Sequence, residues 1–281
     1  MTDGYQMLAS LRADPTGAQL GVSLPPGRLV APEPGMDADW EGPAYWLSDT
    51  APDPALFARL RGSGLWPVLL GGYHGDENRP WADGEVEPGA MSTPEGFAAT
   101  ELLAEWWSQA ADGAEDDGDH LGRDRRLAIV EPYTAWPGPA PAGDRRKAPD
   151  TAADDLARLL TGTPDIFGLN GVRLGLVPAT RSADTIAALG WTGPVNYEND
   201  AAKYAAVLRD WEDRFGARVV AVGFDTLHVS VAAPPTTPDH ALHVAAEHFA
   251  FCPDNVWQHA KDLQDYAWRL MGTGSWHFWW D

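Results

Sequence analysis

The sequence predicts an α+β fold, in which a mainly antiparallel sheet carries helices packed on one face and is preceded by a second α+β region. Two observations in the C-terminal half predict this class. The elements there follow the order strand, helix, helix, strand, strand, helix, helix, strand. The two central strands, Arg218–Val222 and Thr226–Val231, are joined by the short turn Gly223–Asp225. Because parallel strands need a crossover of about a dozen residues, this pair must be antiparallel.

Each element of the C-terminal half has a local sequence signal. Apolar residues at helical spacing predict a helix over Asp200–Phe215. Thr237 followed by Pro238 is typical of a helix start, and predicts a helix that ends near Phe251. The remaining predicted elements are helices at 152–160, 183–189 and 255–270 and strands at 172–177 and 276–280.

The N-terminal half, residues 1–131, is predicted to be a tryptophan-rich α+β region. Its signals are an apolar run that ends in two glycines, and a Thr-Pro helix start followed by apolar residues on one side. They predict strands at 44–47, 65–70 and 127–130 and helices at 54–60 and 93–110. The proline-rich residues 132–150 are predicted to be a linker, and 151–281 the C-terminal domain.

The charge of the chain argues against two classes of partner. Acidic residues outnumber basic ones by 41 to 20, and the net charge is −21. A protein that binds DNA or RNA needs a basic surface to neutralise phosphates, so we expect no nucleic-acid partner. An anionic membrane surface would repel the chain for the same reason, so we expect no membrane partner either.

The single cysteine, Cys252, indicates a reducing compartment, because one cysteine cannot form an intramolecular disulfide. Residues 1–16 lack the basic segment and the apolar run of a signal peptide. No segment approaches the roughly 18 apolar residues of a spanning helix. We therefore predict a cytoplasmic protein.

Five segments of the C-terminal part resemble, in order, those of domain-of-unknown-function family 4253. They are GPVNYEND (193–200), WEDRFGARVV (211–220), GFDTLHVSVAAPPTT (223–237), AEHFAFCPDNVWQ (246–258) and FWWD (278–281). The resemblance covers about residues 173–281, and it implies a domain boundary and a bacterial intracellular setting. The segments WPVLLGG and AEWW are similar to an extra N-terminal region of some members. The resemblance implies no reaction, cofactor or catalytic residue.

One predicted helix carries a cluster of metal-binding residue types. His240, His243 and Glu247 share one face of it, with His248 beside them. A histidine and a carboxylate one turn apart can bind zinc if a third ligand arrives, and the preceding hairpin offers two, Asp225 and His228. The spacing does not match HExxH, however, and a surface pair between His243 and Glu247 is the alternative. We predict no cofactor, and keep zinc as the alternative hypothesis.

Cys252 has a reactive and a structural interpretation. If it capped the helix that follows, free N–H groups would lower the pKa of its thiol, and His248 and Asp254 would complete a Cys-His-acid arrangement. Free cysteine is also among the most buried residue types, and the flanking Phe249 and Phe251 favour packing.

The last strand supplies a candidate binding surface. Trp276, Phe278 and Trp280 lie on one face of it, and His277, Trp279 and Asp281 on the other. One face must belong to the core, so the other is free to bind. The candidate residues for this surface are Asn196, Trp257, Trp279 and Asp281.

Two functional hypotheses follow from these patterns. The first, which we favour, is a non-catalytic protein-binding or regulatory module whose acidic, tryptophan-rich surface engages a protein partner, for which a basic protein is one candidate. If that protein were a toxin, the role would be of an immunity type. The second is a hydrolase-like enzyme built around His243, Glu247, His228 and Cys252. It requires these side chains to converge, so finding His228 and His243 on opposite sides of the sheet would exclude it.

Overall fold

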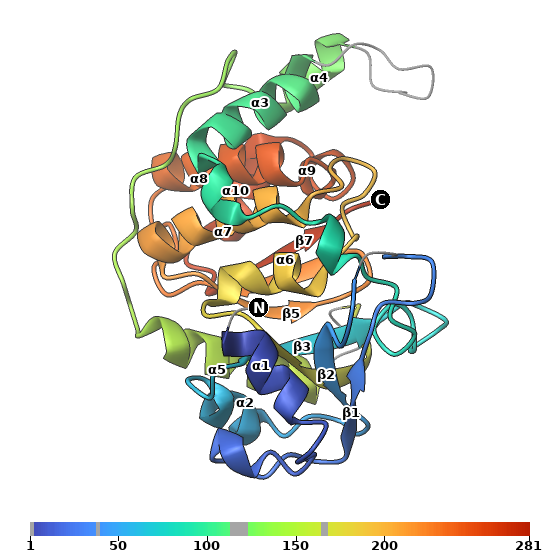
Figure 1. The fold of residues 1–281 in the computed structure, drawn as a ribbon. Helices are drawn as coiled ribbons and strands as arrows, with labels where there is room; N and C mark the ends of the chain where they lie inside the picture. The colour runs from blue at the N-terminus through green and yellow to red at the C-terminus, as the bar shows by residue number, and fades with distance from the viewer. Residues whose placement is uncertain (1–2, 38–39, 113–122, 164–167) are drawn as a thin grey trace.

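The computed structural model describes residues 3–37, 40–112, 123–163 and 168–281. Within them, one seven-stranded sheet has the order β1-β2-β4-β3-β5-β6-β7 (Figure 1). Its strands are β1 (Gly27–Val30), β2 (Tyr45–Ser48), β3 (Trp66–Gly72), β4 (Asn170–Val177), β5 (Arg218–Val222), β6 (Thr226–Ser230) and β7 (Ser275–Trp279). Neighbouring strands are antiparallel, apart from the parallel pair β3 and β5. The predicted α+β class is confirmed.

The sheet continues across the linker that the sequence predicts. Strand β3, from the N-terminal half, lies between β4 and β5 of the C-terminal half. It pairs with β5 where Leu69 lies opposite Ala221, and with β4 where Leu69 lies opposite Leu174. Both halves of the chain therefore contribute to one sheet.

Helices cover both faces of this sheet. One face carries α3 (Ala99–Asp112), α6 (Thr185–Leu189), α7 (Ala201–Phe215), α8 (Pro238–Phe251) and α10 (Leu263–Leu270). The opposite face carries α1 (Asp3–Ser10), α2 (Pro54–Leu60) and α5 (Pro149–Gly162). The sequence predicted helices on one face alone. The second layer follows from the central strands, where Leu69 is buried in one core cluster and its neighbours Val68 and Leu70 in the other.

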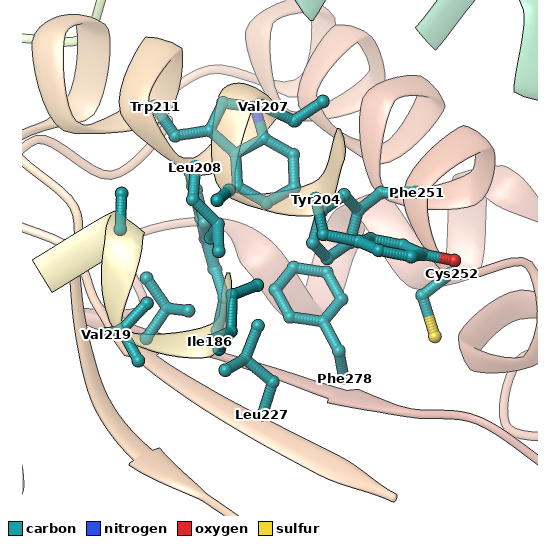
Figure 2. Packing of buried hydrophobic residues seen from close by; sticks show 14 of the residues in the cluster. Ile186, Tyr204, Val207, Leu208, Trp211, Val219, Leu227, Phe251, Cys252 and Phe278 are labelled. Atoms are coloured by element: carbon teal, nitrogen blue, oxygen red, sulfur yellow. The ribbon is translucent and has the colours of Figure 1, made fainter. Parts of the chain in front are cut away.

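Aromatic side chains fill the space between the sheet and α7 and α8. The Trp211 ring of α7 stacks on the Phe278 ring of β7 with centroids 5.6 Å apart. Figure 2 shows these two rings together with Tyr204 and Phe251. Seven of the tryptophans are among the largest fully buried side chains of the described residues: 46, 81, 107, 191, 211, 276 and 280. With Trp106, which is also buried, eight of the 14 tryptophans of this chain serve the core.

The helix ends follow their sequence signals. The Asp200 side chain accepts a hydrogen bond from the Ala202 N–H at the start of α7. Gly216 ends that helix in the left-handed region, with φ of 59°. Thr237 accepts a hydrogen bond from the His240 N–H at the start of α8.

Three predicted elements differ from the structure. Residues 127–130 were predicted as a strand, but belong to the helix α4 (Arg123–Ile129) and the turn that follows it. The predicted helix over 255–270 is divided into α9 (Asp254–Trp257) and α10, because Asp262 accepts a hydrogen bond from the Asp265 N–H and begins a new helix. The helix predicted over 93–110 begins only at Ala99, because the Thr93-Pro94 signal starts the separate 3₁₀ helix Pro94–Gly96. Strand β1 had no predicted counterpart. In the described residues no helix combines the length and the apolar character needed to cross a bilayer.

Candidate functional site

Glu247 is a fully buried structural residue. Its two carboxylate oxygens accept hydrogen bonds from both terminal nitrogens of Arg214, at 2.8 and 2.6 Å. They also accept from the Trp211 indole and from the Ala140 backbone N–H, each at 2.6 Å. The carboxylate thus ties α7, α8 and the segment around residue 140 together. With both oxygens engaged in this way, it is not positioned as a metal ligand.

The histidines of the predicted cluster do not converge. On α8, His240 lies 2.9 Å from the Pro141 carbonyl, and His243 packs on Tyr133 with ring centroids 5.6 Å apart. His228 lies on β6 and packs against His277, its neighbour on β7, with centroids 4.5 Å apart. The flanking Leu227 and Val229 belong to the core beneath α7 and α8, so His228 points to the opposite face.

The convergence that the hydrolase hypothesis requires is therefore not formed, since His228 and His243 lie on opposite sides of the sheet. Among the described residues no group of three His, Cys, Asp or Glu side chains could hold a metal ion.

His248 and Cys252 are core residues. The His248 ring lies between Trp211 and Trp276 and contacts the Tyr266 hydroxyl at 3.1 Å. Burial lowers its pKa to about 3, so the ring is neutral at pH 7. Cys252 ends α8 instead of capping the next helix, and its thiol donates to the Trp279 carbonyl at 3.0 Å. Burial raises the pKa of this thiol, which is the reverse of the shift that a nucleophile needs.

We expect the native Cys252 thiol to resist alkylation. Because it is buried and protonated, iodoacetamide should modify it at least about a hundred times more slowly than in the unfolded chain. Mass spectrometry of time points with and without guanidinium would measure both rates. Rapid modification of the folded protein would contradict the buried, hydrogen-bonded position.

Asn255 caps the outer edge of β7. Its side-chain amide donates to the His277 carbonyl at 2.7 Å and accepts from the Trp279 N–H at 3.2 Å. It also donates to the Tyr266 hydroxyl at 3.0 Å. The bonds to the His277 carbonyl and the Trp279 N–H are those that a neighbouring strand would make. The Asn255 side chain therefore supplies partners for two backbone groups at the edge of the sheet.

Asp254 and its neighbours hold the last residues of the chain. The Asp254 carboxylate accepts from the Tyr197 hydroxyl at 2.8 Å and from the Asp281 N–H at 3.1 Å. Asn196 donates to the Asp281 carbonyl at 2.7 Å. Together with the Asn255 contacts, these bonds form what we call the C-terminal anchor, made of Asn196, Tyr197, Asp254 and Asn255.

Two other predicted site residues meet beside the C-terminal anchor. The Trp279 indole donates to the Asp225 carboxylate at 3.2 Å. Burial raises the pKa of Asp225, and the nearby Asp281 adds to this rise. Three residues proposed as a binding surface, Asn196, Trp279 and Asp281, therefore make contacts within the chain itself.

Trp257, the fourth proposed surface residue, lines a pocket of about 110 Å³. We call it the aromatic pocket, because five aromatic side chains surround it. They are Trp106 from α3, Tyr197 from the loop before α7, Tyr204 from α7, Phe251 from α8 and Trp257 from α9. Gln109, Ala110, Ala250 and Pro253 complete the lining.

A second pocket, of about 220 Å³, lies between the start of α8 and the outer side of α10. We call it the Trp268 pocket. Its lining residues are Pro132, Pro238, Asp239, Leu242, Gln264, Ala267, Trp268 and Met271. The Trp268 side chain is 64% exposed, the highest value among the exposed large apolar residues of the described chain.

Trp268 was not among the predicted site residues, although the sequence contains a signal for it. The apolar side of the 255–270 segment consists of Val256, Ala260, Leu263, Ala267 and Leu270. Trp268 lies outside this set, and a tryptophan on the polar side of an amphipathic helix is expected to be exposed. The aromatic pocket had no comparable signal, because its rings come from five separate segments.

Comparison with known proteins identifies the C-terminal part of the chain. Residues 173–281 match the family described as a domain of unknown function (DUF4253), in agreement with the resemblance of the five segments. No curated protein and no solved structure matches the chain. Most of the aromatic pocket and the whole C-terminal anchor lie within the matched residues, while the lining residues Trp106, Gln109 and Ala110 lie outside them.

Proposed function

We propose that this chain, whose residues 173–281 match DUF4253, is a non-catalytic cytoplasmic module that binds a basic protein through the Trp268 pocket. The exposure of Trp268 beside an apolar pocket carries the proposal. Exposed apolar surface marks interaction sites, and tryptophan is one of the residue types enriched among those that contribute most to the binding energy of protein interfaces.

The shape of the Trp268 pocket suits one anchoring side chain of a partner. Its volume of about 220 Å³ is enough for one apolar side chain. Pro132 and Pro238 form part of its wall, and proline restricts the backbone there. A wall that is already ordered reduces the entropy that binding would cost.

The charge of the chain supports a basic partner. The net charge is −21, and Asp239 lines the pocket. Glu131, which is exposed, precedes the wall residue Pro132. A partner with lysine or arginine around an apolar anchor would complement this rim, and its association would weaken with salt. A basic toxin would fit this description, and the role would then be of an immunity type.

The contacts of the candidate catalytic residues also favour binding over hydrolysis. Glu247 is engaged by Arg214, the His248 ring is buried among aromatic residues, and the Cys252 thiol donates to a backbone carbonyl. Each of these groups contributes to packing or to hydrogen bonds within the core.

We expect Trp268→Ala to abolish partner binding while leaving stability unchanged. The side chain is mostly exposed, so the free energy of unfolding should change by less than about 0.5 kcal/mol. The full chain would be used to capture proteins from native lysate at low and high salt. Leu159→Ala is the matched control, because Leu159 is an apolar residue of α5 that is 49% exposed on the opposite face.

The result that supports the proposal has three parts. Wild type and Leu159→Ala each capture one protein in a stoichiometric amount, and Trp268→Ala does not. High salt reduces the amount captured. A photoreactive group placed at position 268 should then crosslink to that protein. Capture that is equal for both variants would overturn the proposed site.

A further inference from the structure

The aromatic pocket has the composition of a site for an organic cation. Two of its rings, Trp106 and Tyr204, are stacked with centroids 4.9 Å apart, and Phe251 meets Tyr204 edge-on at 5.0 Å. Figure 2 shows Tyr204 and Phe251 side by side between α7 and α8. Tyr197, which is 42% exposed, gives the pocket an accessible side. Such rings attract cations through the negative potential of their faces.

A buried carboxylate, that of Asp254, is joined to this pocket through Tyr197. Asp254 is 3% exposed and follows the lining residue Pro253. Its hydrogen-bond donors are the Tyr197 hydroxyl, the Asp281 N–H and the Gln258 amide, all of them neutral. Within the described part of the chain no lysine or arginine forms an ion pair with it. Its charge therefore has no ion-pair partner among the described residues, and a cation in the pocket would be attracted to it.

The hydrogen bond from Tyr197 to Asp254 strengthens the same preference. A phenol that donates to a carboxylate gains electron density, and its ring face becomes more negative. The carboxylate therefore acts on a ligand in two ways, through its own charge and through the Tyr197 ring. One lining ring already has a cation beside it, since the Arg126 guanidinium lies 5.6 Å from the centroid of the Trp257 ring, so Trp257 is not counted among the rings open to a ligand.

The size and the lining of the pocket select among cations. A volume of about 110 Å³ admits one compact group. A primary ammonium carries three N–H donors that need acceptors once water is removed. Among the lining residues such acceptors are the Gln109 amide oxygen and the tyrosine oxygens, and the other side chains offer carbon or indole N–H groups. A quaternary ammonium has no N–H donor, so it leaves no hydrogen bond unsatisfied when it moves from water into the pocket.

We propose that the aromatic pocket binds a quaternary ammonium group, with Tyr197, Trp106 and Tyr204 as the contacting rings and Asp254 as the counter-charge. The group can belong to a free metabolite of the choline or betaine type, or to a trimethylated lysine of a protein. The site is separate from the Trp268 pocket and does not depend on the function proposed for that pocket, since the two share no lining residue.

The test is calorimetric titration of the full chain with three probes: choline, a peptide that contains trimethyllysine, and 3,3-dimethylbutan-1-ol. The alcohol has the shape of choline without its charge. We expect choline to bind about ten times more tightly than the alcohol, because the attraction depends on the positive charge. Tighter binding of the peptide than of choline would identify a protein side chain as the source of the group. The reverse order would identify a free metabolite.

Variants of Tyr197 connect the binding to this pocket. Tyr197→Phe keeps the ring but loses the hydrogen bond to Asp254, so it should weaken the affinity by no more than about threefold, while Tyr197→Leu also removes the ring and should weaken it about fivefold or more. Trp268→Ala, in the other pocket, should leave the affinity for choline unchanged. Equal affinities for choline and the alcohol, unchanged binding by Tyr197→Leu, or no saturable binding of either cationic probe would overturn the proposal.

Discussion

Replacing Glu247 with alanine is expected to lower the free energy of unfolding by about 3–5 kcal/mol. The carboxylate is fully buried and receives four hydrogen bonds, two of them from Arg214. Alanine would leave the Ala140 N–H and the Trp211 indole without an acceptor in the core. It would also leave Arg214, whose side chain is 15% exposed, with Asp210 as its remaining carboxylate partner.

Chemical denaturation followed by tryptophan fluorescence would measure this loss. Asp213→Ala is the matched control, because Asp213 is a 79% exposed carboxylate whose Arg181 contact is long, at 3.5 Å. We expect the control to change stability by less than about 0.5 kcal/mol. Since Glu247 also holds Ala140, limited proteolysis should cleave the 132–148 segment faster in Glu247→Ala. Equal stability of the two variants would contradict the role assigned to this ion pair.

The second large effect is expected at Asn255. Replacing it with leucine, a side chain of similar size, should cost about 2–4 kcal/mol, because each buried polar group left unpaired costs about 1–3 kcal/mol. The groups affected are the His277 carbonyl, the Trp279 N–H and the Tyr266 hydroxyl. The substitution also exposes the edge of β7 to pairing with other chains.

Hydrogen exchange gives the measurement that is specific to this site. In Asn255→Leu, the Trp279 amide should lose protection more than the amides of the central strand β3. Asn199→Leu is the control, because Asn199 is an exposed residue of the loop before α7. It should change neither the free energy of unfolding nor the protection of the Trp279 amide. Retained protection at Trp279 would show that β7 does not depend on the Asn255 side chain.

The candidate sites show how far local patterns reach. His240, His243 and Glu247 do share one helix, as their spacing predicts. Spacing along one helix does not determine what lies opposite, however. In the structure Arg214 and Trp211 of α7 take both oxygens of Glu247, and His228 points to the other face of the sheet. The metal and hydrolase hypotheses depended on which side chains lie opposite this helix face, and the sequence does not contain that information.

The residues that define the family resemblance proved to be close in space. Asn196 and Tyr197 come from the segment GPVNYEND, Asp254 and Asn255 from AEHFAFCPDNVWQ, and Asp281 from FWWD. Hydrogen bonds join these segments in the C-terminal anchor. The sequence displayed the segments in order, but only the fold revealed that they bind one another.

By itself the sequence determined the fold class, the net negative charge and the positions of α7 and α8. These properties depend on composition and on periodicities within one segment, such as the apolar seam of α7 and the Thr237 cap of α8. The tertiary structure decided the insertion of β3 between β4 and β5, the second layer of helices and both pockets. Each of these features joins segments that are far apart in the chain, and their pairing is set by the packing of whole surfaces, which no local pattern encodes.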